Sequence, residues 1–215
     1  MALCLDTHCH LDAHEFAVDL DAVIEKAAQV GVNGVLIPAV KAQDFDAVVR
    51  LANRASLPMP ETCYTIGIHP IYTPQAQKSD LDILRSSVIA AMADPRFVGI
   101  GEIGLDYFLP DLDAHQQAFF FEAQLDLAEE FDLPVVLHVR RSQDAILKAL
   151  RRRKISGGIA HAFNGSFQQA HQFIQLNFVM GFGGAMTFPR ALQIRRLATE
   201  LPIESIGLET DAPDI

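Results

Sequence analysis

The amino-acid sequence predicts an α/β fold, a TIM (β/α)8 barrel, and three observations lead to this prediction. Short runs rich in β-branched residues recur along the chain, as in strands that are buried on both faces of a parallel sheet. Apolar stripes with helical spacing lie between these runs. No glycine-rich phosphate loop follows the first run, which disfavours an open doubly wound sheet, the alternative α/β fold.

Eight runs are predicted to be strands because each is short and apolar. In chain order they span residues 2–6, 34–39, 63–68, 97–100, 134–137, 158–160, 178–181 and 205–208. Eight parallel strands are the number that closes a TIM barrel.

Five of the segments between these runs carry an apolar stripe on one helical face. The stripes are Phe45, Val48, Val49 and Ala52; Leu81, Leu84, Val88 and Met92; Ala118, Phe121, Leu125 and Ala128; Ile146, Leu147 and Leu150; and Ala170, Phe173 and Ile174. Residues three and four positions apart lie on one side of a helix, so each stripe is interpreted as a contact with the core. We expect seven helices to alternate with the eight strands.

The end of the sequence leaves the predicted barrel without its final covering helix. The eighth run ends near Glu209 and the sequence stops at Ile215, with no further helical stripe. We therefore expect one domain over residues 1–215 that is C-terminally truncated; the alternative is that something else covers the apolar outer face of the last strand.

Composition excludes several classes of protein. A net charge of −10 argues against a protein that coats nucleic acid nonspecifically, although not against an enzyme that binds a nucleic-acid end locally. No apolar run is long enough to cross a membrane, and no secretory signal is visible. Three cysteines without a CxxC pair argue against a disulfide framework. We expect a monomer in the reducing cytoplasm, without membrane contact.

Polar residues with metal-binding chemistry follow the ends of the predicted strands. The carboxyl ends of parallel strands meet on one face of a barrel, and this face carries active sites. His8 and His10 are two residues apart and point to the same side of the first strand, whereas Cys9 between them points away. The residues at the strand ends are His8, His10, His69, Glu102, His138, His161 and Asp211.

Six of these residues, without His69, are predicted to bind metal. Nitrogen and oxygen donors without thiolate suit Zn, Mn, Fe or Ni, and Mg suits the oxygen-rich part. Six ligands are too many for one four-coordinate ion with an open position, so we expect two divalent ions, Zn, Mn or Mg, with Glu102 between them. Two such ions about 3.5–4 Å apart can activate a shared hydroxide.

At these residues the sequence resembles the TatD family of metal-dependent deoxyribonucleases, within the amidohydrolase-like barrels. The matching segments, in chain order, are DTHCHL at 6–11, GIHP at 67–70, GEIGLDY at 101–107, LHVR at 137–140, HAFNG at 161–165 and LETDAP at 208–213. The resemblance implies a TIM barrel with one or two metal ions that hydrolyses phosphodiester bonds in DNA, in some members as a 3′ exonuclease on damaged or single-stranded ends.

The resemblance also implies how the ligands are shared. His8, His10, Glu102 and Asp211 would bind one ion, and Glu102, His138 and His161 the other.

For the reaction we expect Asp211 to be ligand and general base, with Glu102 the catalytic carboxylate that bridges the ions. Four residues are predicted to contact substrate or position the groups that do. Arg140 emerges on the face of His138 and can bind a phosphate oxygen pair, with a surface salt bridge as the alternative. The other three are His69, Asp106 and Asn164.

Each of the other three has an alternative, purely structural role. His69 could be a structural histidine before a proline, and Asp106 could cap a loop. Asn164 or Ser166 could be the N-cap of the next helix instead of part of a phosphate site.

A basic run at Arg151–Lys154 is not assigned to DNA binding. A helix that follows the fifth strand runs back towards the opposite face, so its C-terminal cations lie away from the metals.

Two other functions stay open. A small-molecule amidohydrolase or lactonase could use the same metals to activate water towards a carbonyl. Many such enzymes use a carbamylated lysine as the bridge; the fourth and fifth strands end without a lysine, which favours the nuclease. The third possibility is an inactive, truncated barrel that only binds metal or a partner.

Overall fold

The computed structural model describes residues 3–54 and 61–214. Ala2, the first residue of the first predicted strand, lies outside the described residues.

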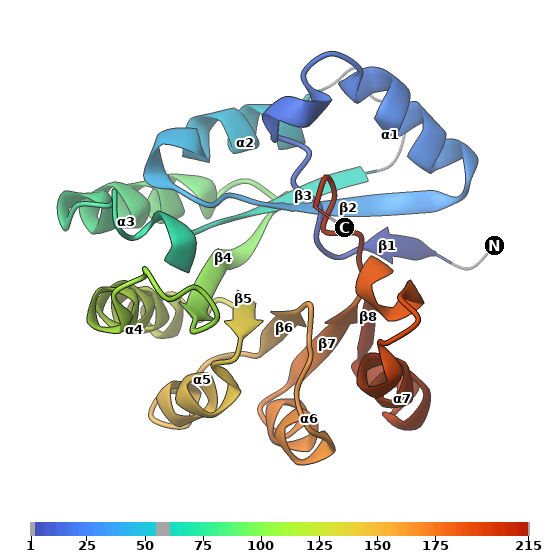
Figure 1. The fold of residues 1–215 in the computed structure, drawn as a ribbon. Helices are drawn as coiled ribbons and strands as arrows, with labels where there is room; N and C mark the ends of the chain where they lie inside the picture. The colour runs from blue at the N-terminus through green and yellow to red at the C-terminus, as the bar shows by residue number, and fades with distance from the viewer. Residues whose placement is uncertain (1–2, 55–60, 215) are drawn as a thin grey trace.

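Eight parallel strands form a single sheet in chain order, which confirms the predicted TIM barrel (Figure 1). The strands are β1 (Cys4–Asp6), β2 (Val32–Pro38), β3 (Glu61–Ile66), β4 (Phe97–Asp106), β5 (Val135–Arg140), β6 (Gly158–His161), β7 (Phe178–Phe182) and β8 (Ile206–Leu208).

The described residues contain seven α-helices, as predicted, and these surround the strands in Figure 1. They are α1 (Leu20–Gln29), α2 (Phe45–Ala52), α3 (Ser79–Ala91), α4 (Ala114–Glu130), α5 (Gln143–Leu150), α6 (Phe167–Ile174) and α7 (Leu192–Glu200). Short 3-10 helices are η1 (His14–Phe16), η2 (Ala42–Asp44), η3 (Pro70–Tyr72), η4 (Gly184–Thr187) and η5 (Ile203–Ser205).

The predicted stripes form the helical side of one core. Val48, Val88, Leu125 and Phe173 are fully buried, one from each of α2, α3, α4 and α6. Met92, predicted as the end of the second stripe, is the C-cap of α3 and is 49% exposed. The predicted stripe therefore extends one residue beyond the buried face of the helix. No helix in the described part of the chain has the length and apolar character to cross a membrane.

The fourth strand is six residues longer than predicted, and Glu102 lies inside it instead of following its end. The register between β4 and β5 shifts between Ile100 and Ile103, and pairing then continues to Asp106. Gly101 and Glu102 end the apolar pattern of the sequence, but both residues are buried, and a buried polar side chain need not end a strand. His138 likewise lies inside β5, and His161 is the last residue of β6.

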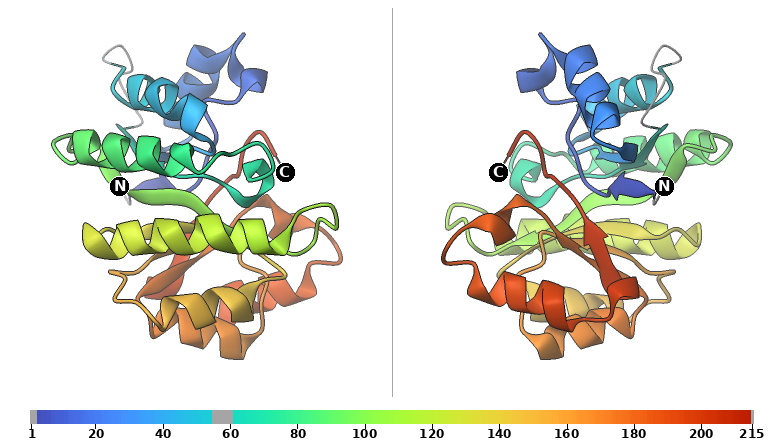
Figure 2. Two further views of the ribbon diagram at one scale, coloured as in Figure 1. Left: turned by 90° about the vertical axis from the view of Figure 1, so that its left-hand side faces the viewer. Right: turned by 90° about the vertical axis from the view of Figure 1, so that its right-hand side faces the viewer.

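The barrel closes between its first and last strands at their carboxyl ends. The backbone N–H of Thr7 donates to the carbonyl of Leu208 at 2.9 Å. In the right-hand view of Figure 2 no described helix covers this seam, and Leu5 of β1 and Leu208 of β8 are about half exposed, at 54% and 53%. The predicted gap in the helical layer is therefore present among the described residues.

Candidate metal centre

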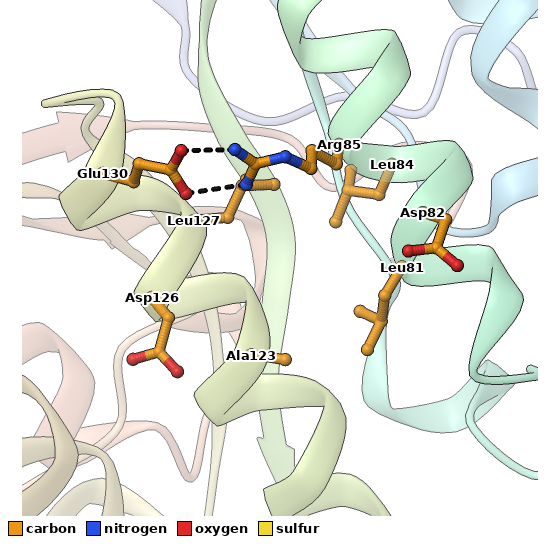
Figure 3. A pocket seen from close by; sticks show the side chains of 8 residues that line it. All are labelled: Leu81, Asp82, Leu84, Arg85, Ala123, Asp126, Leu127 and Glu130. Atoms are coloured by element: carbon orange, nitrogen blue, oxygen red, sulfur yellow. Dashed lines mark hydrogen bonds and ion pairs between the residues drawn. The ribbon is translucent and has the colours of Figure 1, made fainter.

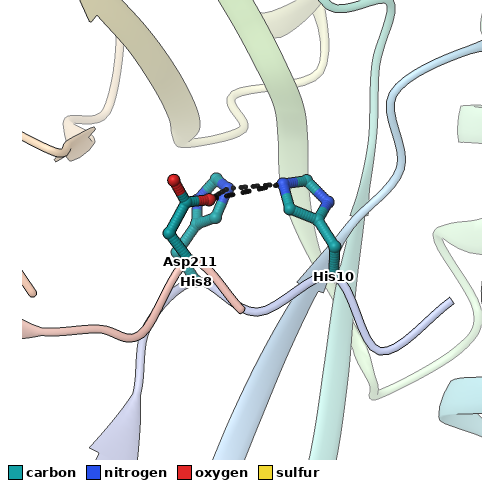
Figure 4. A group of neighbouring side chains, drawn as sticks. All are labelled: His8, His10 and Asp211. Carbon is teal, nitrogen blue, oxygen red and sulfur yellow. Dashed lines mark hydrogen bonds and ion pairs between the residues drawn. The ribbon is translucent and has the colours of Figure 1, made fainter. Parts of the chain in front are cut away.

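His8 and His10, which follow the first strand, and Asp211, which follows the last, point towards one another (Figure 4). The Nε2 atoms of the two histidines are 3.1 Å apart. One Asp211 oxygen, Oδ1, lies 3.8 Å from Nε2 of His8 and 3.7 Å from Nε2 of His10. Three donor atoms thus face one small volume, as ligands of a shared cation do.

Glu102 lies between two groups of imidazoles, and each of its oxygens faces a different group. Oε2 is 3.1 Å from Nε2 of His8 and 3.6 Å from Nε2 of His10. Oε1 is 3.0 Å from Nδ1 of His138. This buried carboxylate therefore has the placement that a bridge between two ions requires.

His161 completes the arrangement from β6. Its ring stacks on that of His8 with centroids 3.5 Å apart, and its Nε2 lies 3.4 Å from Oδ2 of Asp211. Donor atoms of His8, Glu102 and His161 all lie within 4.8 Å of one another, as do those of His69, Glu102 and His138. The donor chemistry and spacing of His8, Glu102, His138 and His161 fit divalent cations.

His69 stands apart from the other imidazoles because a backbone group occupies its second nitrogen. Its Nδ1 accepts a hydrogen bond from the N–H of Ile71 at 3.2 Å. A neutral imidazole carries its proton on the other nitrogen, so Nε2 is the donor and faces Oε1 of Glu102 at 3.3 Å. His69 thus has no free lone pair for a metal, and it orients Glu102 instead.

The charge states of the centre follow from burial and close pairing. Burial raises the pKa of Glu102, but His69, His8 and the hydrogen bond with His138 together hold this pKa well below its ordinary value. Burial, and then the neighbouring His161, lowers the pKa of His8. Burial likewise lowers the pKa of His69 to about 4. A charged carboxylate beside a neutral His8 presents the forms in which both residues bind metal.

Asp106 holds His138 from the far side of the ring. Its Oδ2 lies 3.0 Å from Nε2 of His138, and its Oδ1 accepts hydrogen bonds from the N–H groups of Phe108 and Leu109. Burial opposes ionisation of Asp106, but these bonds lower its pKa to about 2. Asp106 therefore orients a candidate ligand and shapes the following loop.

Asp211 is anchored by the seam, although it lies near the end of the sequence. Its N–H donates to the carbonyl of His8 at 2.9 Å, and the N–H of His10 donates to the carbonyl of Ala212 at 2.8 Å. Beside it, Asp6 accepts hydrogen bonds from the N–H and hydroxyl of Thr210 at 3.0 and 2.7 Å. These contacts hold Asp211 in a left-handed backbone conformation with φ of 58°, which costs about 1–3 kcal/mol in a non-glycine residue.

One residue of the centre, Glu209, was not among the site residues predicted from the sequence. Glu209 is buried, and its Oε2 lies 3.1 Å from Nδ1 of His161. The available signal was its position two residues before Asp211.

The other two residues predicted to contact substrate, Arg140 and Asn164, are exposed. Arg140 has no carboxylate partner within residues 3–54 and 61–214, which removes its salt-bridge alternative; its guanidinium lies 4.1 Å from the ring centroid of Phe108. Asn164 is exposed, and its carbonyl accepts a hydrogen bond from Gln143. Ser166, and not Asn164, caps α6.

Two hollows of the described surface differ in their relation to the centre. One is a groove between α3 and α4, crossed by the ion pair of Arg85 and Glu130, and none of the candidate ligands lines it (Figure 3). The other lies where β6, β7 and β8 end, and both Glu209 and Asp211 line it. Only the second hollow opens beside the centre.

Comparison with known proteins identifies the family. The sequence model of TatD related DNases matches residues 5–215. The chain belongs to this family. A relative from Escherichia coli K12, named "Uncharacterized metal-dependent hydrolase YjjV", is 39% identical over 98% of this chain and 80% of its own length. The crystal structure of the Escherichia coli TatD homologue YjjV superposes with a TM-score of 0.91 at 38% identity, covering 98% of this chain and 80% of that one.

A second relative carries a name that specifies its reaction. The "3'-5' ssDNA/RNA exonuclease TatD" of Erwinia tasmaniensis is 32% identical over 97% of this chain and 79% of its own length. With the candidate ligands described above, these relatives identify the chain as a metal-dependent hydrolase of the TatD family.

Proposed function

We propose that this TatD-family hydrolase cleaves phosphodiester bonds in single-stranded DNA, with two divalent ions, Zn, Mn or Mg, held by His8, His10, Glu102, His138, His161 and Asp211. The name of the Erwinia relative supports this reaction. The placement of Glu102, with one oxygen towards His8 and the other towards His138, supports two ions.

The observation that carries the choice of substrate is a pair of cations beside the centre. Arg140 and Arg141 lie over the ring of Phe108, with guanidinium carbons 4.1 and 4.6 Å from its centroid. Both arginines are exposed, and neither pairs with a carboxylate in the described part of the chain. In a protein with a net charge of −10, two unpaired guanidiniums next to a metal centre favour a phosphate-bearing substrate.

Phe108 fixes these cations relative to the ligands. Arg140 follows His138 by two residues on β5, and the backbone of Phe108 is hydrogen-bonded to Asp106, which holds the same His138. Phe108 therefore contacts the two arginines through its ring and, through its backbone, Asp106, which holds the candidate ligand His138. A phosphate bound here would lie next to the centre.

Asp211 and the two arginines have different roles in the proposed reaction. Bound divalent ions supply an activated water and positive charge at the phosphate oxygens. Asp211, whose side chain is 23% exposed, is the most accessible carboxylate of the centre and accepts the proton of the attacking water. Arg140 and Arg141 bind the phosphate oxygens and align the scissile bond.

The test compares substrates on protein loaded separately with Zn, Mn and Mg, with the bound metal counted by elemental analysis. Single-stranded DNA labelled at its 5′ or 3′ end should be shortened only by loaded protein, and the two labels give the polarity. Duplex DNA and RNA measure the preference. Hydrolysis of lactones or cyclic amides without any cleavage of DNA would overturn the proposal in favour of the small-molecule enzyme, and inactivity of loaded protein on all substrates would favour the metal-binding barrel.

A further inference from the structure

Glu209, directly after β8, is a buried carboxylate with two N–H donors in front of it. Its side chain is 1% exposed. Oε1 accepts a hydrogen bond from the N–H of Ala162 at 2.7 Å, and Oε2 lies 3.1 Å from Nδ1 of His161. The second contact has the distance of an ion pair but not the geometry of a hydrogen bond, and neither atom has a hydrogen-bond partner among the described residues. Each atom thus depends on the other to offset its burial.

Gly181 provides the space that this carboxylate fills. A Cβ atom on Gly181 would lie 2.0 Å from Oε2 of Glu209, closer than any real contact. The backbone of Gly181 is outside the left-handed region, so glycine is not required there for its conformation. On β7, Gly181 is instead required because the side chain of Glu209 occupies the place of its Cβ.

The same contact shapes the backbone beside the ligand. Ala162, next to His161, has a φ of 45°, which is unfavourable for a residue with a side chain. The carboxylate of Glu209 holds the N–H of this residue, so one side chain fixes both the ring of His161 and the turn that follows it.

His138 has an equivalent arrangement on the other side of the centre. Asp106 contacts its Nε2 while Nδ1 faces Glu102. For His161 the nitrogens are reversed: Glu209 contacts Nδ1, and Nε2 faces Asp211. In both histidines a carboxylate holds the nitrogen turned away from the candidate ligands, and such carboxylates orient metal-binding imidazoles and raise their basicity.

We propose that Glu209, seated in the space left by Gly181, is a positioning residue that keeps the proton of His161 on Nδ1 and presents Nε2 to the metal. The inference rests on the metal centre of the proposed function and is independent of whether the substrate is DNA. It also gives Gly181, which carries no functional group, a role in metal binding.

The test is the affinity of purified protein for Co²⁺, measured by competition with a chelating dye, together with the visible absorption of bound Co²⁺. In Glu209→Gln the amide offers one acceptor and one donor where two N–H groups must be accepted, so one pairing fails. The apparent Kd should rise between about 10-fold and 100-fold, and the absorption band should change.

Gly181→Ala should reproduce this loss without altering any polar group, because its methyl displaces the carboxylate. The matched control is Gly207→Ala, which pairs with Gly181 across β7 and β8 but would place its Cβ at 3.2 Å from Thr7 and away from Glu209. Co²⁺ affinity of the control should stay within about twofold of the parent. The double variant Gly181→Ala/Glu209→Gln should bind no more weakly than Glu209→Gln, since both changes act on one contact.

Thermal unfolding of the metal-free variants separates positioning from general stability. A purely structural role would lower the melting temperature and leave the Kd and absorption band of bound Co²⁺ unchanged, and this result would overturn the inference. Unchanged affinity in Gly181→Ala would overturn it as well, even if Glu209→Gln failed to fold. Weakened Co²⁺ binding in a protein that cuts no DNA would uphold the inference while the nuclease proposal fails.

Discussion

At the scale of single residues, the centre is organised by which atom of each imidazole is already engaged. His69 uses Nδ1 for a backbone N–H, so it can only donate to Glu102 through Nε2. His138 and His161 each have one nitrogen held by a carboxylate, and the other faces the centre. Residue type alone therefore does not distinguish a ligand from a supporting group, whereas the partner of the second nitrogen does.

Replacing Asp211 with asparagine tests the proposed proton acceptor. The amide keeps the size and the backbone contacts of Asp211 but cannot take a proton from water. We expect Asp211→Asn to lower kcat at least about 100-fold with an unchanged circular dichroism spectrum. The variant must be compared at matched metal content, because the residue is also a candidate ligand. Near-normal turnover in fully loaded Asp211→Asn would remove this role.

Arg141 offers a test of phosphate binding that leaves the metal ligands untouched. Removal of its guanidinium in Arg141→Ala should raise KM for single-stranded DNA about tenfold, change kcat little, and weaken the dependence of KM on salt. Arg151→Ala is the matched control, because this arginine at the end of α5 hydrogen-bonds Gln172 and lies at the opposite end of the barrel from the centre. Equal effects of the two substitutions on KM would show that DNA binding depends on the overall charge of the protein and not on the position of Arg141 beside the centre.

At the scale of elements, the sequence predicted the strands well because burial on both faces imposes a continuous apolar run. It also predicted that metal-binding side chains gather at the strand ends, since parallel strands bring those ends together. It missed the continuation of β4 past Ile100, where pairing with β5 resumes after a shift in register.

The seam and Glu209 could not be predicted in the same way. Asp6 and Thr210 are hydrogen-bonded across 204 positions of sequence, and Glu209 fills a space defined by the absence of a side chain on β7. Such contacts depend on the three-dimensional packing of specific side chains, and no periodicity in the sequence encodes them.

Asp94 gives a pH-dependent test of how α2, β3 and β4 are joined. Burial raises its pKa, but hydrogen bonds from the N–H of Arg96, from Asn53 and from buried Tyr64 lower it overall. A carboxyl whose pKa is lower in the folded state stabilises the fold above its unfolded pKa of about 3.9. This contribution is lost as the pH falls through the lower folded value.

Urea unfolding of metal-free protein measures this contribution. Asp94→Asn should unfold about 1–2 kcal/mol more easily than the parent at pH 7, since hydrogen bonds to a charged acceptor are lost. The difference should shrink as the pH falls below about 4, because the parent's carboxyl then becomes protonated. A difference that is the same at pH 7 and pH 3 would show that the charge of Asp94 does not support these elements.

At the scale of the whole molecule, the candidate ligands come from both ends of the chain and from its middle. His8 and His10 follow the first strand, Glu102 lies in the fourth, and Asp211 follows the last. The barrel closes at this point through a few hydrogen bonds, and no described helix covers the seam outside. A metal bound to these residues would therefore link the first and last strands and stabilise the closed barrel.

Removal of metal should lower the melting temperature of the whole domain in a single transition. With free metal about 100 times above its Kd, binding only to the folded state adds about 2.7 kcal/mol, which is about 5–11 °C for a domain of this size. Differential scanning calorimetry with and without a chelator measures the shift, and stoichiometric metal should restore it. His8→Ala is the control, because loss of this buried ligand should abolish most of the difference between loaded and chelated protein. An equal melting temperature of the parent with and without metal would mean that the ions do not stabilise the barrel by linking its first and last strands.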